Sequence, residues 1–461
     1  MDVPETERNT TRSAGQGGTQ LDQYLWERHT RAALHSLDHM PDCPYRRFVG
    51  WMAAQPRYAD RWFQLSDLTA QARMAQELLS GLFTRDEWVC LVDHIALMNV
   101  HQSYETFSDN LAIGLAAPRE PRHQASEDRR AVLLAFNDAM LARLGGKADA
   151  EEVRARILGL RPRARAVSVF RQSLGESEYR ELAGAFLSAH PDVDPEGIEF
   201  DVAPVLLANI ETAFAQVENM SGHATTRPLR AGLARRYSAV TRQLTQPPFS
   251  PRELLSVGTD SVLVVPTIVY CAGVIAELVR PAPGYAAVLA GGGLEHAANA
   301  AALSIRLLND CGTQLLEQSR EDHERLVMGL REVHASEGGG GATLSDLLLR
   351  AQADHGELLT RFTKDLLFGE FNVCLDGIRD LPVTSATLAL LEGRLDHVRA
   401  EYRDARSSML YATLSLTRGL GDDVLSVLIH RFVDFQRSTY SHAFDSTLGE
   451  YAIPLSPEPA P

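Results

Sequence analysis

The stretch "IRLLNDCGTQLLEQ", residues 305–318, places three oxygen-bearing side chains four residues apart in an apolar segment. These are Asn309, Thr313 and Glu317, with Asp310 beside the first. On an α-helix a step of four residues overshoots a full turn by about 40°, so the three side chains share one face over about 12 Å. The stretch therefore predicts one helix with a polar stripe among Ile, Leu and Cys residues.

Apolar residues at three-to-four spacing predict helices on both sides of this stretch, and alternating patterns typical of strands are nearly absent. The expected fold class is all-α. Up to residue 245 we expect helices at 21–40, 64–83, 84–115, 128–144, 149–158, 166–173, 176–189, 202–219 and 227–244. Beyond it we expect longer helices, richer in small residues, at 251–279, 293–335, 343–378, 384–417 and 421–446. This change predicts a disordered segment 1–20, an N-terminal helical region 21–245, a C-terminal helical region 246–450 and a flexible tail 451–461.

Composition narrows the class of protein. The chain has 461 residues, of which 45% are hydrophobic, and a formal net charge of −15. That charge disfavours nucleic acids and anionic membrane surfaces as partners. The most hydrophobic stretch, 261–276, is shorter than the roughly 20 residues of a membrane span, and Pro266 interrupts it. We therefore expect a buried core helix there and no stable membrane insertion. The absence of a secretory signal and the scattered cysteines predict a cytoplasmic protein with reduced thiols.

The polar stripe at 309–317 has two interpretations. An amide oxygen, a hydroxyl and a carboxylate are hard donors that suit Mg²⁺ or Mn²⁺ and do not suit zinc or copper. A single carboxylate leaves the ion positive charge for the oxygens of a phosphate group. The alternative is an ordinary solvated face. The small and apolar residues just upstream, "GGGLEHAANAAALSIRLL", favour a lined cavity.

The segment "RLLNDCGTQLLE" resembles the second metal motif, the NSE motif, of class I terpene synthases, with the pattern (N/D)Dxx(S/T)xxxE. Asn309, Thr313 and Glu317 match its three Mg²⁺-binding positions, and Arg306 matches a lead-in arginine that would contact the substrate. The resemblance implies a class I terpenoid synthase-like helical bundle, here with additional N-terminal helices. It also implies Mg²⁺-dependent ionisation and cyclisation of a prenyl diphosphate to a terpene hydrocarbon or alcohol. A homodimer is among the oligomeric states to expect.

Two further parts of that family have candidates in this chain. Arg252 is the candidate for the family's arginine that senses the diphosphate, which lies near a helix broken at glycine. Its spacing to Asn309 is longer than is usual in the family. Arg437 and Tyr440 stand for a C-terminal Arg–Tyr pair, although two residues separate them where the family has adjacent residues.

The aspartate-rich first metal motif of the family has no direct match. Three places are candidates to replace it. The favoured one is Asp93 on the helix 84–115, followed by His101, Glu105 and Asp109 at four-residue spacing. The others are Glu178 with Glu181, and the acidic turn 190–201, which Pro195 and Gly197 interrupt.

The helix 84–115 also supports a different hypothesis. Glu87, His94, His101 and Glu105 fall near one face, as in helical di-iron or heme-oxygenase-like oxidases, and iron accepts carboxylate and imidazole ligands. The chain lacks DxxxH, and its one ExxH pair contains Pro121. A third hypothesis is a non-catalytic helical binding protein, or an inactive relative of the terpene synthases.

Overall fold

The computed structural model describes residues 12–58, 61, 68–115, 124–164, 176–247, 249–336 and 341–441, and within them it contains helices and no strand. The all-α prediction is confirmed. The N-terminal helices are α1 (Arg12–Ser36), η2 (Leu37–His39), α2 (Pro44–Ala53), η3 (Pro56–Tyr58), α4 (Leu68–Leu79), α5 (Arg85–Ala112), α6 (Gln124–Leu144), α7 (Ala150–Leu158), α8 (Arg161–Ala164), α9 (Glu176–Ala189), α10 (Pro195–Glu199), α11 (Ala203–Asn219) and α12 (Thr226–Thr245). The C-terminal helices are α13 (Pro251–Ser261), α14 (Val264–Gly273), the π-helix η4 (Val274–Val279), α15 (Tyr285–Ala290), α16 (Gly293–Cys311), α17 (Thr313–Glu317), α18 (Arg320–Ser336), α19 (Leu344–Phe368), α20 (Ser385–Leu420) and α21 (Val424–Thr439).

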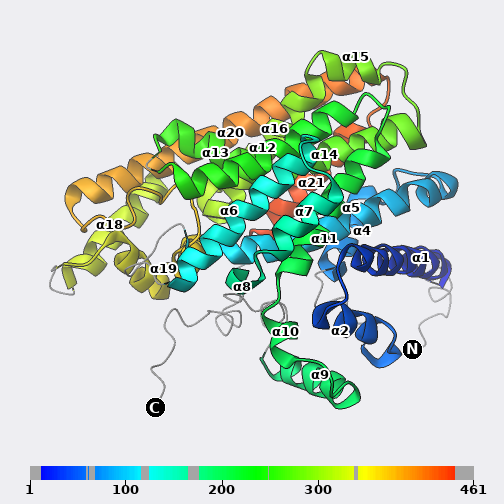
Figure 1. Ribbon diagram of the computed structural model, residues 1–461. Coiled ribbons are helices and arrows are strands. Elements are labelled where there is room, and N and C mark those ends of the chain that lie inside the picture. The colour runs from blue at the N-terminus through cyan, green and yellow to red at the C-terminus, as the bar shows by residue number, and fades with distance from the viewer. Residues whose placement is uncertain are drawn as a thin grey trace, which may run out of the picture.

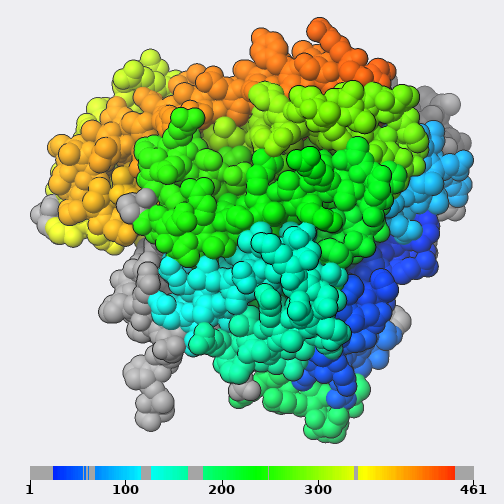
Figure 2. All heavy atoms as spheres, turned by 45° about the horizontal axis from the view of Figure 1, so that its top comes forward, coloured from blue at the N-terminus to red at the C-terminus, as the bar shows by residue number. Residues whose placement is uncertain are grey.

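Long helices pack side by side into a bundle, with α9 and α10 next to α2 at one end of it (Figure 1). The contacts between α16 and α20 are the most extensive in the bundle. Between these two helices, Gly293 of α16 lies near Leu416 of α20, and Ser408 of α20 hydrogen-bonds His296 of α16. In Figure 2, α20 runs along the upper edge of the molecule, above the face formed by α12 to α14.

The termini of the predicted regions differ in how much of them the structure describes. Helix α1 begins at Arg12, inside the segment predicted to be disordered, while residues 1–11 and the tail 451–461 lie outside the described residues. The predicted boundary near residue 245 falls between α12 and α13. Residues on both sides of it, from Ala33 to Val433, share the main hydrophobic core.

Local sequence explains where the helices that carry the site begin. Thr84 caps α5: its hydroxyl accepts from the backbone N–H of Glu87, and the Glu87 carboxylate accepts from the backbone N–H of Thr84. Ser250 and Glu253 form the same reciprocal cap on α13. Such capping boxes satisfy backbone donors that the first turn of a helix leaves unpaired.

The predicted helix 251–279 is interrupted at Val262 and Leu263, and Val262 is extended with φ −85° and ψ 146°. The proline ring of Pro266 clashes with a helical carbonyl four residues earlier, which is that of Val262, so an unbroken helix is disfavoured. All of α14 is buried, as expected for a core helix. Among the described helices, none alone is long and apolar enough to cross a membrane, and one bent pair, Pro251–Ser261 with Val264–Val279, meets the test by length and composition only.

The predicted single helix over 293–335 is wrong, because the chain leaves the helical conformation at Gly312, with φ 81° and ψ 154°. The backbone N–H of Thr313 donates to the carbonyl of Tyr440 at 3.1 Å and not to that of Asn309. The Asn309 carbonyl accepts from Arg361 Nε at 2.6 Å in its place. Asn309 and Thr313 therefore belong to two different helices, α16 and α17, and not to one helix face.

Candidate active site

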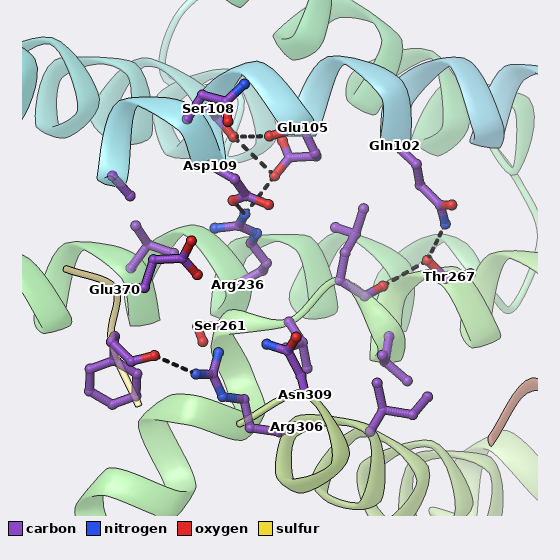
Figure 3. A pocket seen from close by; sticks show the side chains of 18 of the residues that line it. Gln102, Glu105, Ser108, Asp109, Arg236, Ser261, Thr267, Arg306, Asn309 and Glu370 are labelled. Atoms are coloured by element: carbon purple, nitrogen blue, oxygen red, sulfur yellow. Dashed lines mark hydrogen bonds and ion pairs between the residues drawn. The ribbon is translucent and has the colours of Figure 1, made fainter. Parts of the chain in front are cut away.

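A cavity of about 500 Å³ lies between α4, α5, α12, α16, α21, the α13–α14 break and the loop that follows α19 (Figure 3). This volume is in the range of about 300–1,000 Å³ typical of small-molecule sites. Its lining comes from segments between residues 71 and 440, on both sides of the boundary predicted at 245.

One wall of the cavity is an ionic cluster between α5 and α12, in which Arg236 and Glu105 are buried. Arg236 Nη2 lies 2.7 Å from Glu105 Oε2 and 2.9 Å from Asp109 Oδ1. The other oxygen of Glu105 accepts from Tyr237 Oη at 2.7 Å and from Asn209 Nδ2 at 2.8 Å. Burial works to raise the pKa of Glu105, but Arg236 and these donors outweigh burial and lower that pKa. Glu105 is therefore a fixed, ionised counterion for Arg236.

Asp109 differs from Glu105 because its carboxylate faces the cavity. Its side chain keeps 67% of its exposure, whereas that of Glu105 keeps 6%. Surrounding protein atoms raise the pKa of Asp109 to about 6; Arg236 opposes this shift, and the charges of Glu105 and Glu370 add to it. Asp109 is thus the α5 carboxylate that a ligand in the cavity can reach.

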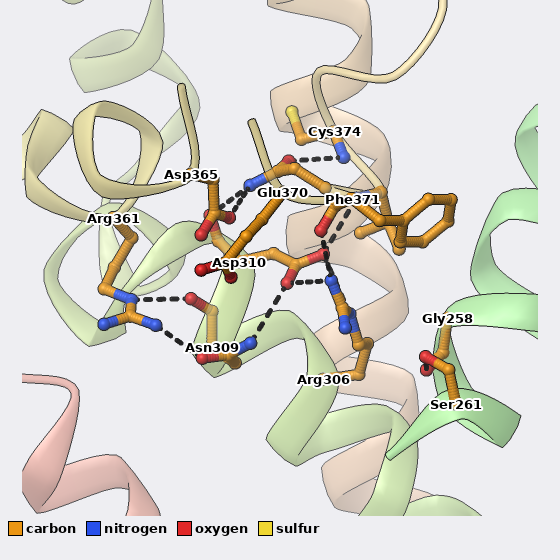
Figure 4. Close-up of polar contacts among 12 residues, drawn as sticks. Gly258, Ser261, Arg306, Asn309, Asp310, Arg361, Asp365, Glu370, Phe371 and Cys374 are labelled. Carbon is orange, nitrogen blue, oxygen red and sulfur yellow. Dashed lines mark hydrogen bonds and ion pairs between the residues drawn. The ribbon is translucent and has the colours of Figure 1, made fainter. Parts of the chain in front are cut away.

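The opposite wall joins α16 to the loop after α19 (Figure 4). Arg306 forms an ion pair with Asp310 at 2.5 Å and donates to the Phe371 carbonyl at 2.7 Å. Asp310 Oδ2 also accepts from the backbone N–H of Val373 at 2.8 Å, and Asn372 Nδ2 donates to the Asp310 carbonyl at 2.9 Å. The loop is therefore fixed against the motif helix by buried polar contacts.

Asn309 and Lys364 complete this wall. Arg361 donates to the Asn309 side-chain oxygen at 2.5 Å, and Asn309 Nδ2 donates to Asp310 Oδ1 at 3.5 Å. An amide nitrogen carries two N–H donors, so the second N–H of Asn309 is left for a ligand. Lys364 pairs with Glu370 and lies 3.2 Å from an Asp365 oxygen. Burial works to lower the pKa of Lys364, but these carboxylates outweigh it and raise that pKa, so the ammonium group stays charged.

The remaining walls combine apolar side chains with uncharged polar ones, among them Gln102, Gln243 and Thr267. Val262 and Leu263 of the α13–α14 break, Ile305 and Phe432 line the cavity. A small crevice with a wholly apolar accessible lining shares Met74 and Phe432 with it. The cavity therefore combines charged groups with apolar surface, which suits an amphiphilic ligand.

The structure separates the three residues predicted to bind one metal ion. Asn309 lines the cavity, but Thr313 and Glu317 do not. The Thr313 hydroxyl donates to the Arg437 carbonyl at 2.6 Å, and Glu317 forms an ion pair with the Arg437 guanidinium at 2.6 Å on the surface. The Asn309 oxygen faces Arg361. This donor set does not fit a single magnesium ion. Among the described residues, no three His, Cys, Asp or Glu side chains group in a way that could hold a metal.

The other predicted substrate contacts divide in the same way. Tyr440 lines the cavity, and Arg361 lies over its ring at 4.8 Å. Arg437 does not line the cavity, and Arg252 is exposed in the first turn of α13, away from the helix break. Asp93 is 57% exposed and pairs with Arg28 at 3.2 Å, so the structure places it outside the cavity, while Glu105 and Asp109 of the same helix lie within it.

The two other candidates for an acidic motif lie elsewhere. Glu181 pairs with Arg61 at 2.8 Å, and the side chain of Glu178 lies outside the described residues. In the acidic turn, Asp192 pairs with Arg47 at 3.0 Å and Asp194 caps α10. No described residue of either segment lines the cavity.

The residues considered for an iron site are held by other partners. Glu87 pairs with Arg280 at 2.9 Å, and His94 contacts the Tyr270 hydroxyl at 3.2 Å. His101 contacts the Tyr237 hydroxyl at 3.2 Å, and burial lowers its pKa to about 4. These contacts explain the polar residues of α5 as parts of the packing between helices.

Sequence reasoning missed three charged residues of the cavity: Arg236, Lys364 and Glu370. A signal existed for Arg236, which follows Leu229 and Leu233 on the apolar stripe of α12, and a charge on such a stripe needs a buried partner. Glu370 lies just after α19, in a loop whose position depends on tertiary contacts.

Comparison of the chain with models of known protein families, with curated proteins and with solved structures gives no match.

Proposed function

We propose that this chain is a terpene-cyclase-like enzyme that binds a prenyl diphosphate in the cavity, ionises it and cyclises it. One observation carries the proposal. Arg306, Asn309 and Tyr440, chosen from the sequence for their resemblance to the family, line the same cavity as Glu105 and Asp109 of α5. These segments are far apart in sequence, and the resemblance concerned only local motifs.

The apolar and the charged side chains of the cavity match the two parts of such a substrate. The apolar side chains accept the prenyl chain, and Arg236, Arg306 and Lys364 offer positive charge to the diphosphate. In the reaction the allylic carbon–oxygen bond breaks and its electron pair leaves with the diphosphate. A carbon–carbon double bond of the chain then supplies the electrons that close a ring. Fixed cations favour this step because they stabilise the charge on the leaving group.

Each of these cations already contacts a carboxylate: Glu105 and Asp109 for Arg236, Asp310 for Arg306, and Glu370 for Lys364. A diphosphate that binds here must therefore compete with these carboxylates for the three cations, or it must bind together with additional positive charge. Magnesium or manganese remains the prediction of the family resemblance, and no step here depends on it.

The test incubates the protein with geranyl, farnesyl or geranylgeranyl diphosphate, each with Mg²⁺, with Mn²⁺ and with a chelator alone. Released diphosphate and extracted products are measured. Cyclic products with stoichiometric diphosphate release from at least one substrate support the proposal. Substrate binding without diphosphate release would identify a binding protein and overturn it, as would the absence of binding. Equal turnover in chelator would show that the metal prediction is wrong and leave the cyclase proposal intact.

A further inference from the structure

A hydrogen-bonded chain on the cavity wall fixes the orientation of one amide. Thr267 Oγ1 is 2.7 Å from the Leu263 carbonyl and 2.9 Å from Gln102 Nε2 (Figure 3). The carbonyl can only accept, so the Thr267 hydroxyl donates its one proton to it. Thr267 must then accept from Gln102, and only the amide nitrogen of Gln102 can donate. This order identifies the two ends of the Gln102 amide and directs its oxygen away from Thr267.

The oxygen of Gln102 receives no hydrogen bond from any residue that the structure describes, and Gln102 lines the cavity. On the same cavity, the buried Nε2 atom of Gln243 has no partner within the described part of the chain. Amide groups in an apolar wall cost free energy unless they are hydrogen-bonded. The occupied cavity must therefore supply a donor to Gln102 and an acceptor to Gln243. A prenyl hydrocarbon chain supplies neither, whereas water supplies both.

We propose that Gln102, held by Thr267, positions a water molecule as the second substrate, so that the product is a terpene alcohol. This inference rests on the proposed function. The Gln102 oxygen accepts a hydrogen bond from one O–H of the water. A lone pair of the water oxygen then remains free to attack the carbocation. The lone pair forms the new carbon–oxygen bond, and the surplus proton passes from the water oxygen to the released diphosphate. Gln102 is a positioning residue in this step, because an amide oxygen is too weak a base to keep the proton.

The decisive experiment runs the reaction in H₂¹⁸O and analyses the extracted products by mass spectrometry. The parent protein gives an alcohol labelled with ¹⁸O. In Gln102→Leu the ratio of alcohol to hydrocarbon falls by about tenfold, the factor that one hydrogen bond supplies. Gln246→Leu, at an exposed residue after α12, keeps the parent ratio and controls for the substitution itself.

Thr267→Val is a second variant that tests the inference even if Gln102→Leu misfolds. It keeps the shape of the side chain but removes the hydroxyl that holds Gln102. We expect it to lower the ratio of alcohol to hydrocarbon as well. Only hydrocarbon from the parent protein, or an unlabelled alcohol, overturns the inference and leaves the cyclase proposal standing. An unchanged ratio in both Gln102→Leu and Thr267→Val also overturns it. If the parent protein releases no diphosphate from any substrate, the proposed function is wrong, and the inference that rests on it is wrong as well.

Discussion

Arg306 and Asp310 form an ion pair at 2.5 Å, one helical turn apart, in which the arginine side chain keeps 9% of its exposure and the aspartate side chain none. Arg306 lines the cavity, whereas Asp310 does not. Arg306 donates to the Phe371 carbonyl, and Asp310 accepts from the backbone N–H of Val373 in the same loop. Asp310 was noted in the sequence only as the acidic neighbour of Asn309. In the structure it connects the motif helix to this loop.

Arg306→Met should destabilise the protein by about 3–5 kcal/mol, because it leaves the buried Asp310 carboxylate without its counterion. The measurement is urea-induced unfolding followed by circular dichroism. Arg437→Met is the matched control, since Arg437 pairs with Glu317 at the surface, where an ion pair contributes at most about 1 kcal/mol. Similar small losses in both variants would show that the Arg306–Asp310 pair is not a structural link.

Asn309→Ala should lower kcat/KM for the prenyl diphosphate by about tenfold or more, because it removes an amide donor from the cavity wall. Glu317→Gln should change it by about twofold or less, because Glu317 pairs with Arg437 outside the cavity. Asn299→Ala, on the same helix as Asn309 but outside the lining, controls for the first change. A large loss in Glu317→Gln would restore the predicted metal triad and contradict the arrangement described here.

The helices were predictable because apolar periodicity is a local property. It gave α5 within a few residues of its observed bounds and α16 at its observed first residue, but not the end of α16. The same spacing singled out Glu105 and Asp109 as candidate metal ligands on α5, and in the structure both contact Arg236. Predictions from local spacing were wrong at Gly312. There the Thr313 N–H donates to the Tyr440 carbonyl, and the helix ends. Tyr440 is more than a hundred residues from Thr313 in the sequence, so no pattern around 309–317 could reveal this hydrogen bond. Lys364 and Glu370 were missed for a related reason, because their place on the wall depends on the loop that Asp310 holds.

His101 should make stability depend on pH between about 6.5 and 4. Burial lowers its pKa to about 4 in the folded protein, so in this window the unfolded chain binds a proton that the folded chain does not. The contribution of neutral His101 to the free energy of unfolding is therefore complete above about pH 6.5, and up to about 3 kcal/mol of it is lost as the pH drops to 4. His101→Gln should flatten this part of the curve of unfolding free energy against pH. His35→Gln, at an exposed residue, should keep the parent slope. Parallel curves for the parent and His101→Gln would show that His101 is not the responsible group.

Gly312→Ala should destabilise the protein by about 1–2 kcal/mol, because a positive φ at this position is strained for any residue with a side chain. An added Cβ would also lie 3.2 Å from Arg361 Cγ, and Arg361 is the residue that holds Asn309. We therefore expect Gly312→Ala to lower product formation as well as the midpoint of urea unfolding. Gly393→Ala is the matched control: Gly393 lies inside α20 with open space around its Cα, so alanine there should stabilise the helix by about 0.5–1 kcal/mol. If Gly312→Ala were also stabilising, the chain would continue as one helix through 309–317, and the three oxygen-bearing side chains would share the single face that the sequence first predicted.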